Sequence, residues 1–499
     1  MKWGAFFLTA ALATASVACS GDDDSVAETT PPATAAVTQP ATPPPTTTPP
    51  AATTQPVTQP STTLPETTLP ATTQPPTIAP PDTGINPDGV DALPPLDDAV
   101  ALPIVFVHGF AGSAQQIESN AMRFEMNGYP VDRIVAYEQD GAGLDPLVFV
   151  PGLADTVDAT LAEYGVDQVY LIGHSRGTSV SNAYLDDADH AAKVAKYVAI
   201  DGRPCPELAH TPPCYAPTQA VFAGQAHVEV ASSPEAFAAQ FEFLFDVPPA
   251  VVDVVAQREP VVIEGRAVDF PANTGRAGTT LDIWQIDPAT GQRLADTPHA
   301  TFALADDGAF GPVELAHGAH YEYALTSPES ATVHHIYVQP YLRSSRFVRL
   351  LSGGPESVTR VNTNASDDHV SLIAMRMREW YAEDRADVDG DQRDVLELSS
   401  VDGTVDALAK FVGNGTIGVH LHDDAATPGE STLTPLPFFS EQPFQSGVDV
   451  LLPASPDASG TITVTNYPRG DRSAPQTFNV PDWPSSGHAV SLLFTDFPL

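Results

Sequence analysis

The alternation of strand-like and helical segments between residues 103 and 245 restricts the fold of this chain more than any other feature. The strand-like segments are short, apolar and rich in β-branched or aromatic residues; they are "PIVFVHGF" (103–110), "RIVAY" (133–137), "DQVYLIG" (167–173), "KYVAIDG" (196–202) and "TQAVFAG" (218–224). Apolar spacing predicts helices over 151–164, 177–187 and 233–245. This order predicts an α/β domain over 96–257, with a mostly parallel sheet and helices on both faces.

One strand-to-helix junction carries a serine between two glycines. Gly173-His174-Ser175-Arg176-Gly177 fits the Gly-X-Ser-X-Gly nucleophile elbow, a sharp turn that exposes the serine oxygen and needs small residues around it. The same five-residue pattern also occurs in glycine-rich packing turns. Its position after a predicted strand and before a predicted helix favours the elbow, with Ser175 as the nucleophile.

A serine hydroxyl is a weak nucleophile, so it needs a base that a carboxylate orients. On this kind of elbow the acid and then the histidine follow the serine along the chain. Asp201 ends the apolar run "YVAI" just before Gly202, and His227 follows the predicted strand 218–224. These two are the predicted acid and base. The competing residues are Asp186, Asp187 and Asp189 on a polar helix end, His210 between two cysteines, and His190 on the surface.

Acyl transfer also needs N–H donors for the oxyanion of the tetrahedral intermediate. The predicted donors are the backbone N–H of Arg176, at a helix start, and that of Phe110, which follows His108 and Gly109 after an early strand. Catalysis needs only the amide of residue 176. We therefore expect the Arg176 side chain to be free to vary, facing water or pairing with a nearby acid.

Longer blocks of sequence are more specific than the elbow; they are "VFVHGFAGSAQQIESNAMRFEMNGYP", "GHSRGT", "AAKVAKYVAIDG", "AHVEVASSPEAFAAQFEFLF", "GRAVDF", "YLRSSRFVRLL" and "VSLLFTDF". From about residue 100 to the end, the chain resembles the exported archaeal and bacterial lipases that join an α/β-hydrolase domain to a C-terminal β-barrel domain. The resemblance implies that Ser175, Asp201 and His227 are nucleophile, acid and base, with Phe110 and Arg176 forming the oxyanion hole. It implies acylglycerols and other carboxylic esters as substrates.

Two features depart from that family. Its members with a lid insert helical residues after the segment matching 133–137, where this chain has only Glu138–Val150 before the next helix. A full lid does not fit, so we expect an open site that hydrolyses dissolved short or medium-chain esters without a rate jump at their solubility limit. The interval from Asp201 to His227 is also compact and holds two cysteines.

The N-terminus predicts export. Lys2, the apolar residues 3–18 and "SVACSGDDD" resemble a bacterial lipoprotein signal in which Cys19 becomes lipidated. Ser16 departs from the leucine usual at its position, so ordinary secretion with a free Cys19 stays an alternative. We expect a signal over 1–19, a lipid anchor to the membrane at the outer face of the cell envelope, and a Pro/Thr-rich linker over 20–95 that cannot form a packed core.

Export also bears on the other two cysteines. Cys205 and Cys214 are nine positions apart in an oxidising compartment, so we expect them to form a disulfide. A loop this short adds about 2 to 3 kcal/mol to stability in the chain-entropy picture. A metal site is not expected with so few thiols.

The net charge of −41 argues against a nucleic-acid partner, because polyphosphate binding depends on Lys and Arg displacing counterions. The same charge predicts a self-repelling acidic surface.

Beyond residue 258, alternating apolar residues and regular turn signals predict antiparallel β structure. We expect a β-sandwich domain over 258–345 and a further barrel-like β domain over 346–499. These domains carry no catalytic signal. Their expected role is either stability and spacing or, as the resemblance implies, lining the acyl-binding side of the active site.

Two patterns in this half invite a metal interpretation, and neither is favoured. "DRADVDGDQRD" (384–394) contains Asp387, Asp389 and Asp391, but Gln392 and Leu398 stand where a calcium loop requires glycine and glutamate. A solvated acidic loop is the prediction. His334 and His335 are adjacent, so we expect them on opposite faces of a strand, where they cannot share a metal.

The leading interpretation is a monomeric, surface-anchored serine ester hydrolase of lipase type that needs no cofactor. One alternative is the same triad used for acyl transfer or for hydrolysis of a polymeric ester such as cutin. Another alternative, from a different class, is a surface binding protein whose hydrolase domain is inert.

Overall fold

The structure is a computed structural model that describes residues 93, 95–96, 101–353, 364–382, 393–411 and 415–499. The predicted signal, Cys19, the linker except for residues 93 and 95, and Asp387, Asp389 and Asp391 lie outside these residues. All described residues belong to one compact unit that spans 77–499. None of the helices described in this unit is long and apolar enough to cross a membrane.

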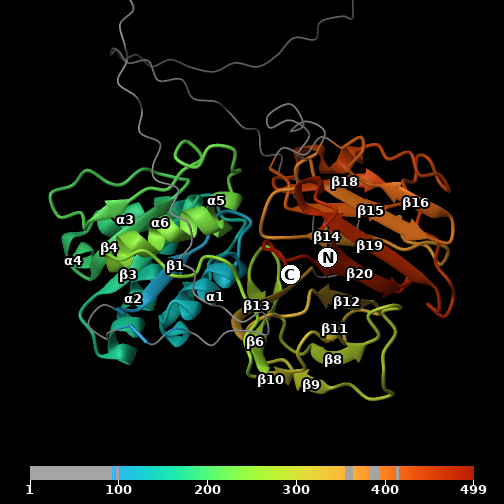
Figure 1. Cartoon of the computed structure of the whole chain (residues 1–499), viewed down its shortest axis with the longest axis horizontal. Helices are drawn as coiled ribbons and strands as arrows, with labels where there is room; N and C mark the ends of the chain where they lie inside the picture. The colour runs from blue at the N-terminus through green and yellow to red at the C-terminus, as the bar shows by residue number, and fades with distance from the viewer. Residues whose placement is uncertain (1–92, 94, 97–100, 354–363, 383–392, 412–414) are drawn as a thin grey trace, which may run out of the picture. The chain divides into compact units, whose positions relative to one another are not determined.

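A five-stranded parallel sheet forms the first half of the described chain (Figure 1). Its order is β2 (Ile134–Tyr137), β1 (Ile104–Val107), β3 (Val169–His174), β4 (Val194–Ile200) and β5 (Cys214–Tyr215). The α-helices are α1 (Glu118–Met126), α2 (Val150–Tyr164), α3 (Arg176–Leu185), α4 (Ala188–Ala191), α5 (Glu229–Ser232) and α6 (Pro234–Phe245), with 3-10 turns η1 (Ala114–Ile117), η2 (Val131–Arg133) and η3 (Pro146–Phe149).

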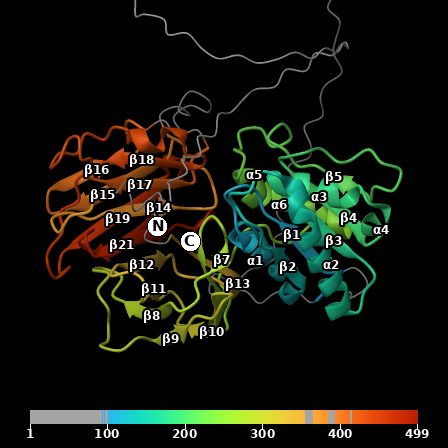
Figure 2. The same ribbon diagram turned by 180° about the vertical axis from the view of Figure 1, so that it is seen from behind.

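Helices cover both faces of this sheet, as predicted (Figure 2). Alternate residues of each strand point to opposite faces. Ile104 and Phe106 of β1 therefore pack with α1 and α6, whereas Val105 and Val107 pack with α2 and α3. One expected strand is absent: residues 218–224 form turns, and Val221 is 59% exposed. The prediction of a buried strand here is wrong: the length and composition of the run fit a strand, but its side chains are not enclosed.

An eight-stranded sheet dominates the second half. Its order is β18 (Gln445–Asp449), β17 (Gly418–His422), β14 (Leu372–Met375), β21 (His488–Leu493), β12 (Val333–Val338), β11 (His320–Thr326), β8 (Thr280–Ile286) and β9 (Ala300–Ala303). It joins strands from both expected β segments, 258–345 and 346–499, in one sheet. Most pairings are antiparallel, but β12 and β14 pair with β21, and β17 pairs with β18, in parallel.

Two smaller sheets pack on opposite faces of this large sheet. One contains β10 (Ala309–Leu315), β6 (Val261–Asp269), β13 (Ser345–Ser352) and β7 (Thr274–Gly275), and its core includes Ile336 of β12. The other contains β16 (Gly403–Asp406), β15 (Val395–Ser400), β19 (Thr461–Tyr467) and β20 (Gln476–Pro481), and its core includes Tyr337 of β12. Successive residues of one strand thus enter two cores. The 3-10 turns here are η5 (Pro437–Glu441) and η6 (Pro468–Gly470).

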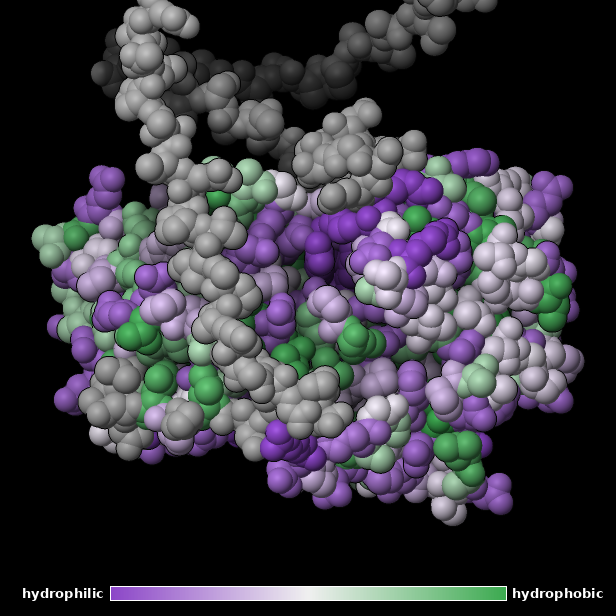
Figure 3. All heavy atoms as spheres, viewed as in Figure 1, coloured by the Kyte–Doolittle hydropathy of each residue, from purple (hydrophilic) through white to green (hydrophobic). Residues whose placement is uncertain are grey.

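On the face of the molecule in Figure 3, hydrophilic residues are widespread and hydrophobic ones occur in small, separate groups. This distribution agrees with the acidic composition of the chain.

Candidate active site

Ser175 sits in the sharp turn between β3 and α3. Its backbone has φ 56° and ψ −122°, a strained conformation for a residue other than glycine. The flanking glycines allow helix and strands to approach: a Cβ on Gly177 would lie 2.0 Å from the carbonyl oxygen of Val107, and one on Gly173 would lie 2.9 Å from that of Gly177. The elbow pattern therefore has a steric cause at these two positions.

The structure brings Ser175, His227 and Asp201 into a continuous hydrogen-bond chain. The Ser175 Oγ lies 2.8 Å from Nε2 of His227, and Nδ1 of His227 lies 2.6 Å from Oδ2 of Asp201. A neutral imidazole that donates from Nδ1 keeps the lone pair of Nε2 for the serine proton. The arrangement can therefore draw a proton from the hydroxyl.

Asp201 is held as a carboxylate. Gln219 donates to both of its oxygens, from its backbone N at 3.0 Å and its side-chain Nε2 at 2.8 Å. Burial raises the pKa of this carboxyl, but the hydrogen bonds from His227 and Gln219 outweigh burial and lower the pKa to about 2. Asp201 is thus ionised at any pH at which the imidazole can act as a base.

The turns at 218–224 position the acid and the base, a role that we expected of a strand. They carry Gln219 to Asp201 and lead the chain to His227, just before α5. The competing residues are engaged elsewhere: Asp187 caps α4, His190 stacks on Tyr184, and His210 contacts the backbone carbonyl of Leu185.

Two other histidines organise the backbone around this chain. His174 lies with its ring centroid 4.9 Å from that of His227, and its Nε2 donates to the His227 carbonyl oxygen at 3.1 Å. Burial, followed by the nearby His227, lowers the pKa of His174 to about 3. His108 donates from Nδ1 to the Gly109 carbonyl and accepts the Gln139 N–H at Nε2. Burial also lowers the pKa of His108. Both rings are therefore neutral, and they hold the neighbouring backbone through hydrogen bonds.

Both predicted oxyanion donors border the serine. Arg176 is the first residue of α3, and Phe110 follows Gly109, where a Cβ would lie 2.9 Å from the Ser175 Cβ. Within the described residues no acceptor takes the backbone N–H of Phe110 or of Arg176. The two N–H groups are therefore available to a ligand.

The Arg176 side chain does not behave as the sequence suggested. Its guanidinium donates to the backbone carbonyls of Asp140, Gly141 and Gly143 and lies 4.8 Å from the ring centroid of Phe149. The half-buried guanidinium is therefore bound to backbone carbonyls and not to an acid. Residues 140–149 contain no strand or α-helix that would fix their backbone. The Arg176 guanidinium fixes this segment instead, through three of its backbone carbonyl oxygens.

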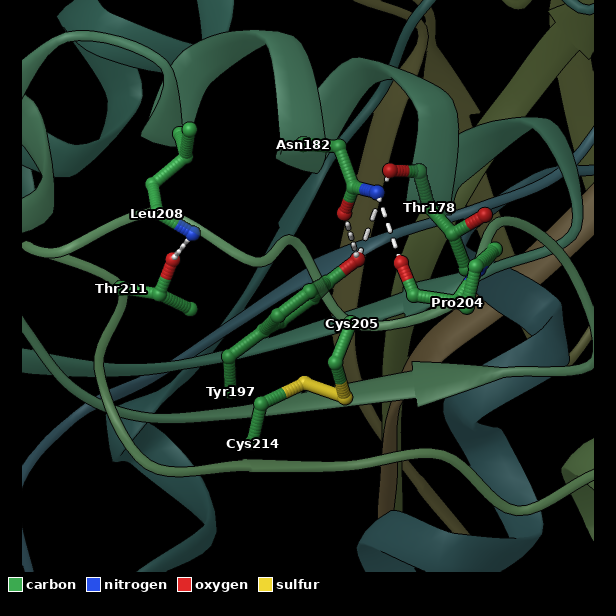
Figure 4. The surroundings of a disulfide bond; sticks show 8 residues. All are labelled: Thr178, Asn182, Tyr197, Pro204, Cys205, Leu208, Thr211 and Cys214. Carbon is green, nitrogen blue, oxygen red and sulfur yellow. Dashed lines mark hydrogen bonds between the residues drawn. A yellow bond between two sulfur atoms is a disulfide. The ribbon is translucent and has the colours of Figure 1, made fainter.

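The predicted disulfide joins Cys205 to Cys214 (Figure 4). Cys214 begins β5, which pairs with β4 next to Asp201. The loop that leaves Asp201 is also tied to α3, because Asn182 donates to the Pro204 carbonyl at 2.9 Å. The crosslink thus fastens the chain between the acid and the base to the sheet edge.

A cluster of charged side chains, most of them from the β part of the chain (258–499), holds the turn that follows His227. The buried Glu379 accepts the backbone N–H groups of Val228 at 2.5 Å and Glu229 at 2.9 Å. The Glu229 carboxylate in turn pairs with Arg378 at 2.5 Å and with Arg469 at 2.9 Å. Sequence reasoning missed this cluster. The only local signal was the grouping of two arginines and a glutamate in "MRMREWY" (375–381).

A pocket of about 490 Å³ has Phe110, one of the predicted oxyanion donors, in its wall. The α/β part contributes residues 110–113, Gly141 and Ala142. The β part contributes the rest of the wall, including Phe444, whose ring stacks 6.2 Å from that of His227. Most of its lining side chains are apolar. The β part therefore forms much of this cavity, as the family resemblance implies for the acyl-binding side.

In the described part of the chain no group of three or more His, Cys, Asp or Glu side chains is arranged to hold a metal ion. His334 and His335 point to opposite faces of β12, as predicted: His334 contacts Ser352 and Ser491, whereas His335 contacts Glu322 and His488.

Comparison with protein families matches the β part of the chain. The family described as "Lipase C-terminal domain" matches residues 259–355. A second family, whose description reads "-like, C-terminal domain", matches residues 358–498. None of the curated proteins matches the chain.

The chain is similar over part of its length to solved structures that are described as hydrolases. An extracellular α/β-hydrolase from a Paenibacillus species has 20% identity and a TM-score of 0.17 over 21% of this chain and 42% of that one. A structure from work on carboxylesterases of the thaumarchaeon Nitrososphaera gargenis has 26% identity and a TM-score of 0.18 over 22% of this chain and 40% of that one. A predicted CIB-like hydrolase from Thermoplasma acidophilum has 13% identity and a TM-score of 0.23 over 30% of this chain and 90% of that one. The chain thus spans less than half of the first two relatives. The fold assignment rests on the strand order and helices described above, and residues 259–355 are similar to a lipase C-terminal domain.

Proposed function

We propose that the chain is an exported carboxylic ester hydrolase that forms an acyl-enzyme on Ser175 and acts on acylglycerols or similar esters. The observation that carries this proposal is the hydrogen-bond chain from Ser175 through His227 to Asp201. A glycine-rich packing turn would not need a base and an ionised acid aligned with its serine.

In this mechanism His227 takes the proton of Ser175 as Oγ forms a bond to the ester carbonyl carbon. The N–H groups of Phe110 and Arg176 stabilise the oxyanion, and the Asp201 carboxylate stabilises the imidazolium. Collapse of the intermediate breaks the bond to the alcohol, which leaves with the proton from His227. Water then attacks the acyl-enzyme by the same route and releases the acid.

The acyl group occupies the pocket beside Phe110 in this proposal. Its volume of about 490 Å³ lies within the range of small-molecule sites, roughly 300 to 1,000 Å³. The β part then has two roles: it forms the acyl-binding wall, and through Glu379 it fixes the turn that carries the base.

Labelling with a fluorophosphonate, followed by an ester panel graded by acyl length, tests the function. An activated Ser175 reacts and the Ser175→Ala variant does not, whereas an inert surface binding protein stays unlabelled. Addition of an alcohol acceptor separates hydrolysis from acyl transfer, and a polyester film tests for a polymer esterase. An unreactive Ser175 in the folded protein would refute the proposal.

Export and anchoring through Cys19 form a separate part of the proposal. Mass spectrometry of the mature N-terminus distinguishes a diacylated Cys19 from a free thiol. Partition of the protein into detergent, lost in Cys19→Ala, supports the anchor; an unmodified Cys19 in the aqueous phase contradicts it.

A further inference from the structure

The floor of the acyl pocket is one face of the eight-stranded sheet. Ile373 of β14 lies opposite His420 of β17 on one side and Ser491 of β21 on the other, so the three side chains share a face. Gln445 of β18 lies opposite Gly418, two residues from His420, and shares that face too. The smaller sheet with β6 and β13 packs on this face over β8, β11 and β12, and leaves the part over β14, β17 and β18 to the pocket.

This floor carries hydrogen-bonding groups that the proposed mechanism does not use. Burial lowers the pKa of His420 to about 4, so its imidazole is neutral. Its Nε2 donates to the Gln445 Oε1 at 2.9 Å. The His420 Nδ1 lone pair and the Gln445 amide N–H groups then have no hydrogen-bond partner among the residues that the structure describes. Both side chains line the pocket.

A second polar group lies at His334 of β12. Its two ring nitrogens contact the hydroxyls of Ser352 and Ser491, at 2.9 and 2.8 Å. An imidazole can accept only one proton, so at most one of these hydroxyls donates to the ring. At least one serine O–H is therefore left to donate elsewhere, and both serines line the pocket.

These groups matter for the substrate because a plain alkyl chain would displace their water without replacing its hydrogen bonds. We propose that the pocket selects acyl groups that carry an acceptor oxygen along the chain, such as a second ester or keto carbonyl, so that the substrates are esters of oxygenated acids or oligoesters. This inference rests on the proposed ester hydrolysis. The Gln445 amide and the spare serine hydroxyl are alternative donors for acyl chains of different length, because β18 and β21 lie three strands apart in the sheet.

Matched substrate pairs test it on the full chain. One series contains p-nitrophenyl esters of the monomethyl esters of C4 to C10 dicarboxylic acids, and the other contains p-nitrophenyl alkanoates with the same number of chain atoms. All rates are divided by the rate of hydroxide hydrolysis. For at least one chain length we expect kcat/KM to favour the diester by about fivefold, the value of one net hydrogen bond.

Two variants locate the effect. Gln445→Leu and His420→Phe should bring that ratio to about one or below, whereas the matched control Ser446→Ala, next on β18 but pointing to the opposite face, should keep it. Alkanoates preferred at every length by the wild-type protein would overturn the inference and leave ester hydrolysis intact. Absence of hydrolysis in both series, with Ser175 unlabelled, would instead remove the proposed function itself. Thermal unfolding checks that each variant is folded.

Discussion

Glu379 provides the sharpest test of how the β part supports the proposed reaction. Its carboxylate, 1% exposed, accepts two consecutive backbone N–H groups directly after His227. Glu379→Ala leaves those N–H groups without an acceptor. Each unsatisfied buried group costs about 1 to 3 kcal/mol, so the turn should relax toward other acceptors and carry His227 with it.

The kinetic consequence follows from geometry. A displacement of a catalytic group by about 1 Å costs on the order of 100-fold in rate. We therefore expect kcat to fall about 100-fold in Glu379→Ala. Glu379→Gln keeps one acceptor oxygen but turns an N–H₂ toward the other donor, so a loss of about tenfold is expected. KM for a short ester should change by less than about threefold, because the acyl pocket is untouched.

The assay is p-nitrophenyl butyrate hydrolysis, together with the rate of fluorophosphonate labelling. Both rates depend on activation of Ser175 by His227, so both should fall by the same factor, and a merely structural defect would instead lower the active fraction at unchanged labelling rate. Glu430→Ala, an exposed acid of the same β part, is the control. Wild-type kcat in a folded Glu379→Ala protein would refute the reasoning.

Three further predictions follow from the site and its surroundings. Ser175→Ala should lower the rate of ester hydrolysis by about 10⁴-fold or more. Arg176→Ala keeps its backbone amide and should retain labelling of Ser175. Its unfolding temperature should fall, because the carbonyls of the 140–149 segment lose their donor. Burial raises the pKa of Glu118 to about 7, against the hydrogen bond from Ser345, so the folded state holds a proton there that the unfolded state has released; stability from this proton is complete below about pH 4.5 and is lost as the pH rises through about 7. Chemical unfolding at pH 5 and pH 8 should show this loss in the wild type and not in Glu118→Gln, and an equal loss in both would contradict the assignment. Rates on a short triacylglycerol should rise smoothly through its solubility limit, because 138–150 is too short for a full lid; a sharp jump there would contradict an open site.

Local sequence determined the α/β half of the molecule. Short apolar runs separated by helical spacing specify parallel strands and covering helices, and the glycines of the elbow specify the turn at Ser175, because both signals depend on residues close together in the chain. Asp201 could be chosen because it ends a strand that really is buried. The prediction of His227 as the base depended on a strand at 218–224 that does not form, since these residues form turns with an exposed Val221.

Only the tertiary structure decided what surrounds those residues. The floor of the pocket comes from strands that belong to two expected domains. Parallel pairs of strands that are distant in the chain alternate in it with an antiparallel pair, so no sequence alternation reveals their order. Glu379 reaches the turn after His227 from about 150 residues further along the chain, and Arg176 finds the carbonyls of a segment that precedes it. Periodicity records which side of its own element a side chain faces. Which distant backbone group that side chain meets is set by the packing of sheets and helices against one another, and it is this packing that aligns the base with the serine.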